Sequence, residues 1–380
     1  MRAIGIVLAG GSSSRMGELS RKRAVSAMPV AGSFKSIDFA LSNMSNSHIK
    51  KVAVLTQYRA ESLNQHLNSS KWWDFGRKQG GLYILTPSIT SENSYWYRGT
   101  ADAIYQNLSF LKSSHEPYVV ISSGDCVYKM DYNKVIEAHI EKKADITVVY
   151  KNLNLREDDP TRFGVLKILE DGKIAEFQEK PLETTDHLIS TGIYVIRRRY
   201  LIELIEKSNK EGRYDFVQDI LVRYCGNKSF YGYRHEGYWS NIATVESYYK
   251  TNMDFLKKDV RDYFFKSYPS IYSKVSDMPP AKYNPGADIK NSLVSGGCIV
   301  NGEVKNSILF KKVFIGNNCI IKNSIILDDV YIGDNTVIEN CIVESGNTIN
   351  ANTSYVNRIG DAEEEGDIKI VIEGNERYII

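Results

Sequence analysis

The feature that most constrains the fold is a repeat of apolar residues in the last quarter of the chain. Aliphatic residues recur about every five to six positions, at Ile299, Val304, Ile308, Val313, Ile320, Ile325, Val330, Val337 and Ile342. Polar residues and scattered glycines separate them. This spacing fits neither the 3.6-residue period of a helix nor the alternation of a strand. It is typical of a parallel β-helix in which each coil has three short sides.

The first two thirds of the chain alternate between strand-like and helix-like segments. Strands are expected at 3–8, 52–55, 118–122, 146–150 and 192–196, and helices at 37–43, 101–111, 132–142 and 200–207. This alternation predicts an α/β domain with a mostly parallel sheet and helices on both faces. Ligands of such folds bind beyond the carboxyl ends of the strands, where Gly10-Gly11 and Ser123-Gly124-Asp125 are expected to lie.

The length of the chain and a proline- and glycine-containing segment within it predict two domains. The chain of 380 residues is too long for one ordinary core. Met278-Pro279-Pro280 and Asn284-Pro285-Gly286 interrupt it in the manner of a linker. We therefore expect a first domain over residues 1–265, a linker over 266–285 and the β-helix over 286–380.

Composition excludes several partners and compartments. The 48 basic and 46 acidic residues nearly balance, so we expect neither nucleic acid nor a membrane as partner. No apolar stretch is long enough to span a bilayer, and Met1-Arg2 enters a strand without a signal-peptide pattern. Five cysteines without a CxxC pair favour reduced thiols over a zinc site. These features predict a cytoplasmic protein.

The loop after the first strand has the composition of a phosphate-binding loop. The strand over residues 3–8 runs directly into Ala9-Gly10-Gly11-Ser12-Ser13-Ser14-Arg15. A short apolar strand that feeds a flexible, hydroxyl-rich loop is the usual position for the phosphates of a nucleotide. A single Gly-Gly loop is a weak signal, but further motifs follow it in order along the chain.

Those motifs together resemble the ADP-glucose pyrophosphorylase (glucose-1-phosphate adenylyltransferase) family over essentially the whole chain. The matching blocks are Leu8-Ala9-Gly10-Gly11 with Arg15, Ile37-Asp38-Phe39-Ala40-Leu41-Ser42-Asn43, Tyr97-Arg98-Gly99-Thr100-Ala101-Asp102-Ala103, Ser123-Gly124-Asp125, Glu179-Lys180-Pro181 and Gly192-Ile193-Tyr194-Val195. The resemblance implies a Rossmann-like nucleotidyltransferase domain followed by a left-handed parallel β-helix.

The resemblance also implies a reaction and the residues that carry it. A sugar-1-phosphate oxygen attacks the α-phosphate of ATP and pyrophosphate leaves, assisted by Mg²⁺ between carboxylates and by cations on the phosphates. Of the catalytic positions, Arg15 and the metal carboxylate Asp125 are retained. Val25 replaces the phosphate-binding lysine, and Asn241 replaces the second metal carboxylate. Because Asn241 offers a neutral oxygen, Mg²⁺ is expected to bind weakly or not at all.

Two further groups of residues are carried over by position. The residues implied to bind the nucleotide are Leu8, Ala9, Gly10, Gly11, Gly99, Asp102 and Gly124. Those implied to bind the sugar phosphate are Tyr97, Glu179, Lys180, Ser190, Asp215, Phe216 and Trp239, with Lys180 on the phosphate. The residues implied for the sugar phosphate are thus kept, whereas two of those implied for phosphoryl transfer are replaced.

Simpler interpretations of these residues stay open. Lys22 could reach the phosphate in place of the missing lysine, and Asn241 could still support slow turnover. Asp125 could only stabilise the turn after Gly124. Glu179 and Lys180 could form a solvent-exposed ion pair.

Three functions follow from the resemblance. The first is a catalytically impaired regulatory subunit in glycogen biosynthesis, similar to the GlgD-type proteins of Gram-positive bacteria, which forms a heterotetramer with a catalytic homologue. The second is a slow adenylyltransferase that acts as a homotetramer and binds ATP and glucose-1-phosphate. The third is a scaffold without ligands. In bacterial relatives a lysine contacts the activator, and the resemblance implies Ser33 at that position here, with Lys35 nearby. Effector binding by this chain is therefore an open question.

Overall fold

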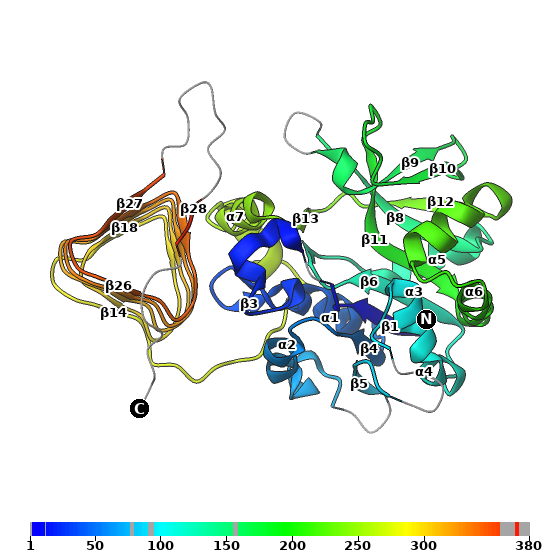
Figure 1. Ribbon diagram of the computed structural model, residues 1–380, viewed down its shortest axis with the longest axis horizontal. Helices are drawn as coiled ribbons and strands as arrows, with labels where there is room; N and C mark the ends of the chain where they lie inside the picture. Colours follow the sequence, from blue (N-terminus) through cyan, green and yellow to red (C-terminus); the bar gives the residue numbers. More distant parts are fainter. Residues whose placement is uncertain are drawn as a thin grey trace.

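The computed structural model describes residues 2–11, 13–76, 80–89, 95–154 and 159–357, and the backbone of 369–371. In this part of the chain an α/β domain stands beside a triangular β-helix (Figure 1). Its helices are α1 (Ser36–Asn46), α2 (Ala60–Leu67), α3 (Thr100–Gln106), α4 (Leu108–Lys112), α5 (Tyr132–Glu141), α6 (Arg198–Lys210), α7 (Val245–Asp254) and α8 (Lys258–Arg261). None of the described helices is both long and apolar enough to cross a membrane.

The N-terminal sheet has the order β10-β9-β11-β6-β1-β4-β5, and β8 joins it through β11 and carries β12. Its strands are β1 (Ala3–Leu8), β4 (Lys51–Leu55), β5 (Gly81–Leu85), β6 (Tyr118–Ser123), β8 (Ile146–Asn152), β9 (Gly164–Ile168), β10 (Ile174–Glu179), β11 (Leu188–Arg197) and β12 (Phe230–Arg234). The four strands from β6 to β5 are parallel, as expected. Strand β11 is antiparallel to β6 and to β8, so the sheet as a whole is mixed.

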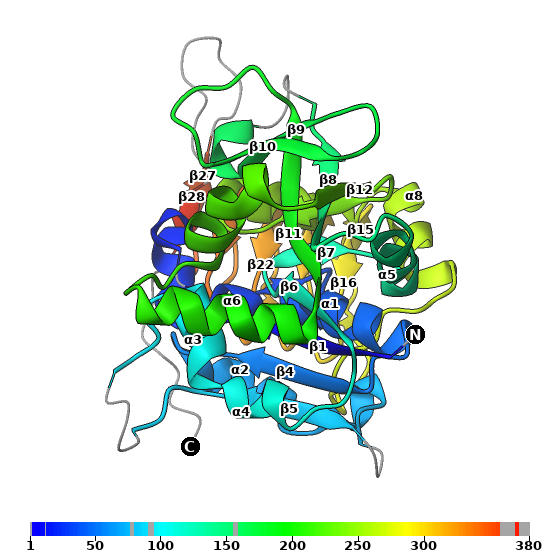
Figure 2. The same cartoon turned by 90° about the vertical axis from the view of Figure 1, so that its right-hand side faces the viewer.

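Helices cover both faces of this sheet, which confirms the α/β prediction. Apolar residues of α1, α2 and α5 pack on one face, and those of α3, α4 and α6 pack on the other. Figure 2 shows α6 in front of the sheet. Because both faces are covered, central strands such as β1 are apolar along almost their whole length rather than alternating.

The C-terminal domain is a three-sided parallel β-helix. Among the described residues each side is a sheet of five short strands, in the orders β14-β17-β20-β23-β26, β15-β18-β21-β24-β27 and β16-β19-β22-β25-β28. Besides β14, β17, β25 and β28, these strands are β15 (Asp288–Lys290), β16 (Leu293–Val294), β18 (Glu303–Lys305), β19 (Ile308–Leu309), β20 (Phe314–Ile315), β21 (Ile320–Lys322), β22 (Ile325–Ile326), β23 (Tyr331–Ile332), β24 (Val337–Glu339), β26 (Thr348–Ile349) and β27 (Ser354–Val356). The first strand, β14 (Lys282–Tyr283), pairs with β17 (Ile299–Val300) and so lies inside the range predicted to be linker. The last, β28 (Lys369–Val371), pairs with β25 (Cys341–Val343).

One side of the β-helix packs against the N-terminal domain. Ile308, Ile325 and Ile342 of this side share an apolar cluster with Tyr248 of α7 and with Met16 from the first helical turn of the chain. Figure 1 shows α7 between β28 and β13 (Trp239–Asn241). The segment around Val25 therefore lies between the sheet and the β-helix, which is important for the candidate site.

Candidate functional site

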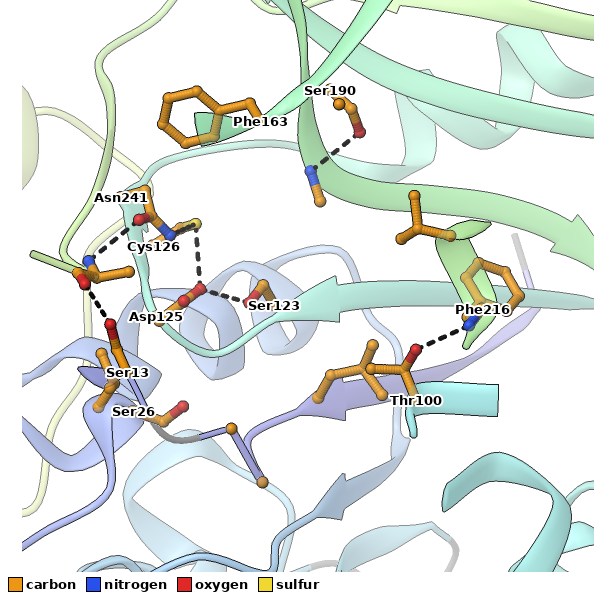
Figure 3. Close-up of a pocket in the computed structure, with 18 of the residues that line it drawn as sticks. Ser13, Ser26, Thr100, Ser123, Asp125, Cys126, Phe163, Ser190, Phe216 and Asn241 are labelled. Carbon is orange, nitrogen blue, oxygen red and sulfur yellow. Dashed lines mark hydrogen bonds between the residues drawn. The ribbon is translucent and has the colours of Figure 1, made fainter. Parts of the chain in front are cut away.

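A cavity of about 460 Å³ opens at the carboxyl ends of the parallel strands. β1 continues into Gly10 and Gly11, β4 leads to Gln57, and β6 leads to Asp125, and all four residues line the cavity. Because parallel strands place their carboxyl ends at one edge of the sheet, segments far apart in the sequence meet here. Figure 3 shows this edge, with Ser13 and Ser26 on one side and Ser190 on the other.

Most of the residues expected at the site line this cavity. They are Leu8, Gly10, Gly11, Arg15, Val25, Tyr97, Gly99, Asp125, Glu179, Lys180, Ser190, Phe216, Trp239 and Asn241. Four expected residues, Ala9, Gly124, Asp102 and Asp215, do not line it. The site residues are thus brought together from both ends of the domain, with four exceptions that have identifiable causes.

Ala9 and Gly124 support the cavity wall from behind. The amide of Ala9 donates to the carbonyl of Leu55 at 2.9 Å, and the amide of Gly124 donates to the carbonyl of Leu8 at 3.0 Å. A Cβ on Gly124 would lie 2.8 Å from Oγ of Ser26. Gly124 is therefore required for the close approach of two loops, and we assign it no direct ligand contact.

Asp102 and Asp215 have structural partners instead. Asp102 is buried, and its Oδ1 accepts a hydrogen bond from Nη2 of Arg98 at 2.8 Å. Hydrogen bonds from Arg98 hold the pKa of the Asp102 carboxyl below its usual value despite burial. Oδ1 of Asp215 accepts from the amide of Gln218 at 2.8 Å and so begins the following helical turn. Neither carboxylate faces the cavity directly.

The two positions that the resemblance implies for the metal, Asp125 and Asn241, are joined by a chain of hydrogen bonds. Strands β7 (Cys126–Tyr128) and β13 are antiparallel, and their register sets Asn241 opposite Cys126. Nδ2 of Asn241 lies 3.5 Å from Sγ of Cys126, and this thiol lies 3.5 Å from Oδ1 of Asp125. The same Oδ1 accepts a short hydrogen bond from the hydroxyl of Ser123 (Figure 3).

The side-chain oxygen of Asn241 also has a protein partner. Its Oδ1 accepts a hydrogen bond from the amide of Ala243 at 3.0 Å. Burial, together with the charge of Asp125, raises the pKa of the Cys126 thiol well above its usual value. The thiol therefore stays protonated at neutral pH and donates toward the carboxylate rather than competing with it as an anion.

This donor set does not fit the two-carboxylate Mg²⁺ site that the resemblance implies. Mg²⁺ prefers oxygen ligands, with carboxylates supplying the charge. Asp125 is one such group, but the Asn241 carbonyl is turned to a backbone amide and its NH₂ group faces the thiol. Within the described ranges no three histidine, cysteine, aspartate or glutamate residues gather in a metal-binding arrangement.

Val25 is part of the apolar packing between the domains. It is 5% exposed and clusters with Met28, Ile242 and Val245 while its surface also lines the cavity. Lys22, the candidate replacement for the missing lysine, is not among the lining residues. Where the resemblance implies a phosphate-binding lysine, this chain therefore has a packing residue.

Glu179 and Lys180, which the resemblance implies for the sugar phosphate, form a charged pair at the cavity. Nζ of Lys180 lies 3.5 Å from Oε1 of Glu179, and the Lys180 side chain is 58% exposed. Burial raises the pKa of the Glu179 carboxyl, and the neighbouring Lys180 charge partly offsets this. Antiparallel pairing of β9 with β10 sets Gly164 opposite Glu179, and a Cβ at Gly164 would lie 3.0 Å from Oε2 of Glu179. The exposed ammonium group is available to a phosphate.

Several cavity residues were not identified from the sequence. Gln57 follows β4 and exchanges hydrogen bonds with the backbone of Tyr97, at 2.6 Å to its amide and 3.2 Å to its carbonyl. The rule that ligands bind beyond the strands could have indicated it. Cys126 and Arg162 also line the cavity. No spacing signal marked either, because strand register and an intervening helical turn bring them to the site.

Comparisons with known proteins agree with this architecture. Residues 4–258 match the nucleotidyl transferase family, and residues 279–369 match the GlmU-like C-terminal hexapeptide family. The chain is 40% identical over 321 residues to a glucose-1-phosphate adenylyltransferase of Clostridium acetobutylicum, which covers 84% of each chain. It is 40% identical over 324 residues to one of Thermosipho melanesiensis, which covers 84% of this chain and 77% of the relative.

Proposed function

The chain belongs to the glucose-1-phosphate adenylyltransferase family, and from this premise we propose that it is a regulatory subunit with little or no catalytic activity of its own. It binds glucose-1-phosphate in the retained part of the site. It assembles in the cytoplasm with a catalytic homologue, as a heterotetramer, and modulates that enzyme's formation of ADP-glucose from ATP for glycogen biosynthesis.

The observation that carries this proposal is the hydrogen-bond chain from Ser123 through Asp125 and Cys126 to Asn241. In-line attack on the α-phosphate builds negative charge on the phosphoryl oxygens and on the departing pyrophosphate. Here the second carboxylate is replaced by an amide whose polar atoms have protein partners, and the lysine position carries Val25. Arg15 is the cation that remains of the family pattern on this side.

The size of the expected defect follows from these losses. Removal of one preorganised group that stabilises the transition state typically lowers the rate by roughly 10²–10³. Two losses around one triphosphate need not multiply, because groups that act as a unit are not additive. A chain with both losses is expected to be a very poor enzyme even when both substrates are bound.

The retained cavity also favours a second candidate, a slow adenylyltransferase. Arg15, Asp125, Glu179 and Lys180 all line one cavity, so the substrates still have partners. In this case the isolated chain turns over slowly in the presence of Mg²⁺ and needs no partner. Measurement of turnover by the isolated chain separates the two candidates.

The test uses the purified full chain and asks two questions. Calorimetric titration with glucose-1-phosphate should show binding, and Lys180→Met should abolish most of it, with Lys173→Met as a control outside the cavity. Pyrophosphate release from ATP and glucose-1-phosphate with Mg²⁺ should be at background. Robust release would establish the enzyme instead, and absence of glucose-1-phosphate binding would leave only a scaffold. Co-expression with a catalytic homologue should yield a complex that contains both chains.

A further inference from the structure

Phe163 lines the cavity although it lies in none of the blocks that carry the family resemblance. It follows the helical turn over Pro160–Arg162, and its amide donates to the carbonyl of Pro160 at 3.1 Å. Its side chain is partly buried against the apolar core of the N-terminal domain. Both its main chain and its side chain contact residues that the proposed function assigns to glucose-1-phosphate.

The main chain of Phe163 holds Lys180. The amide of Lys180 donates to the carbonyl of Phe163 at 3.1 Å, directly beyond the last pair of the ladder between β9 and β10. Lys180 has a φ of 46°, in the left-handed region that residues with a Cβ seldom adopt. The hydrogen bond therefore stabilises the backbone conformation from which the Lys180 ammonium group extends.

The side chain of Phe163 packs on Trp239. The two ring centres are 5.5 Å apart and the ring planes meet at 67°, an edge-to-face arrangement. Trp239 is 9% exposed, and Nε1 of its indole has no hydrogen-bond partner among the described residues. The orientation of the indole is therefore set by packing rather than by a polar contact, and the Phe163 ring supplies part of that packing.

Trp239 faces the cavity from the same strand as Asn241. Residues two apart on a strand point to the same face, and both of these residues of β13 line the cavity. Figure 3 shows the Phe163 ring toward the same end of the cavity as Asn241. Small-molecule pockets combine such aromatic surfaces with a few polar groups that fix the orientation of the ligand. Here the indole offers an apolar surface to a sugar ring, and Lys180 offers a charge to its phosphate.

We propose that Phe163 is a positioning residue that makes the cavity selective for an intact hexose phosphate over phosphate alone. Its ring orients Trp239 against the sugar, and its carbonyl orients Lys180 toward the phosphate. This inference rests on the proposed function, because it takes glucose-1-phosphate as the ligand of the cavity. Since the carbonyl is retained in every side-chain variant, substitution of Phe163 acts on the sugar contact and spares the phosphate contact.

The test is calorimetric titration of the full chain with glucose-1-phosphate. Phe163→Leu keeps an apolar side chain but removes the ring, and we expect the affinity to fall by about 3- to 10-fold, the contribution of one aromatic pair. Phe163→Tyr keeps the ring and should bind as the wild type does. The matched control is Leu182→Ala in the loop after Lys180, because Leu182 is 98% exposed and does not line the cavity.

A double-mutant cycle shows whether Phe163 acts through Trp239. Trp239→Leu should also weaken binding of glucose-1-phosphate. The double variant should bind no more weakly than Trp239→Leu alone, because residues in contact are not additive and the contact is already lost. Inorganic phosphate, titrated as a competitor, should have the same affinity for Phe163→Leu as for the wild type. That result would show that the variant is folded and that Lys180 is in place.

The outcomes separate this inference from the proposed function. Wild-type affinity for glucose-1-phosphate in Phe163→Leu, additive losses in the cycle, or an equal loss of phosphate affinity would overturn the inference. Failure of the wild type to bind glucose-1-phosphate, or of phosphate to displace it, would instead contradict the proposed function.

Discussion

At the scale of single residues, the positions where this chain departs from the family pattern have interactions of their own. The thiol of Cys126 lies between Asp125 and Asn241 and donates toward Asp125. Val25 contributes to the apolar contact with the β-helix side of the molecule. Because Asn241 and Val25 both have partners in the folded protein, we expect their substitution to restore function only in part.

Restoration of the two lost groups is therefore a direct test of the chemistry. Val25→Lys combined with Asn241→Asp returns a cation to the phosphates and a second carboxylate to the metal. We expect pyrophosphate release by the isolated chain to rise by about 100-fold or more, as one recovered electrostatic contribution would already give. The matched control is Val25→Met with Asn241→Ser, which should stay inert. A double variant that binds glucose-1-phosphate yet releases no pyrophosphate would show that the glycine loop has also diverged.

Lys35 gives a pH-dependent prediction. Its ammonium group donates to the carbonyl and the hydroxyl of Ser62, both at 3.3 Å. Burial lowers the pKa of Lys35 to about 8 from 10.5, and the nearby charge of Asp38 only partly opposes this. Below about pH 8 the Lys35 side chain is charged in both the folded and the unfolded state. As the pH rises toward 10.5 the folded state loses this proton first, so the unfolded state binds more protons and stability increases.

The measurement compares wild type with Lys35→Met by urea unfolding between pH 7 and pH 10. The free energy of unfolding of the wild type should rise relative to the variant by up to roughly 3 kcal/mol, from 1.36 kcal/mol per pKa unit. Comparison with the variant removes the contribution of other groups that titrate in this range. A constant difference across the range would show that the amine is hydrated rather than buried.

At the scale of elements, the corners of the β-helix explain why its coils keep a constant length. Asn318, Asn335 and Asn352 have positive φ and stack one above another, with side-chain hydrogen bonds of 3.1 and 3.0 Å between them. Asparagine tolerates this backbone conformation better than other residues with a Cβ because its short polar side chain bonds locally. Each ladder therefore fixes both a turn and the register of the next coil.

Substitution of Asn335 separates these two contributions. Asn335→Ala loses both ladder bonds and keeps a Cβ in the left-handed region without the polar side chain that makes it tolerable, and should lower the free energy of unfolding by about 2 kcal/mol. Asn335→Gly loses the same bonds but relieves the backbone, and should cost less. Equal losses in the two variants, measured by urea unfolding, would show that backbone strain plays no part at this corner.

Elements also show what the sequence could and could not predict. The five expected strands and the β-helix are present because their apolar periodicity depends on local burial alone. The expected helix over 101–111 is divided, with Asn107 between α3 and α4. The pairing of β7 with β13, which sets Asn241 opposite Cys126, joins segments more than a hundred positions apart and leaves no periodic signal. The same holds for Arg162, which reaches the site through a turn outside the main elements.

At the scale of the whole molecule, a buried ion pair joins the β-helix to the segment that leads into Val25. Nη2 of Arg23 lies 2.6 Å from Oε1 of Glu344, and their side chains are 10% and 1% exposed. The same nitrogen donates to Ser345 at 3.1 Å. Ser295 adds a hydrogen bond of 2.7 Å to the carbonyl of Gly32. The β-helix is thus connected directly to the segment that carries Val25 to the cavity wall.

Removal of one partner of this pair should be costly. Glu344→Gln leaves the Arg23 charge buried without its carboxylate, and we expect a loss of roughly 3 kcal/mol in the free energy of unfolding. Arg23→Met combined with Glu344→Leu should be less destabilised than Glu344→Gln, because no charge is left uncompensated. If the wild type, Glu344→Gln and the double variant all unfold at the same urea concentration, the ion pair does not hold the domains together.

The central claim concerns the assembled molecule, so the most direct measurement compares three samples in one assay. Pyrophosphate release from ATP and glucose-1-phosphate with Mg²⁺ is followed for this chain alone, for a catalytic homologue alone, and for the two co-expressed. A subunit that binds the partner's active state more tightly raises the population of that state. The account predicts no release by this chain alone and a higher rate, or an altered response to effectors, in the complex than in the homologue alone. Robust release by this chain alone, or a complex that behaves as the homologue does, would contradict it.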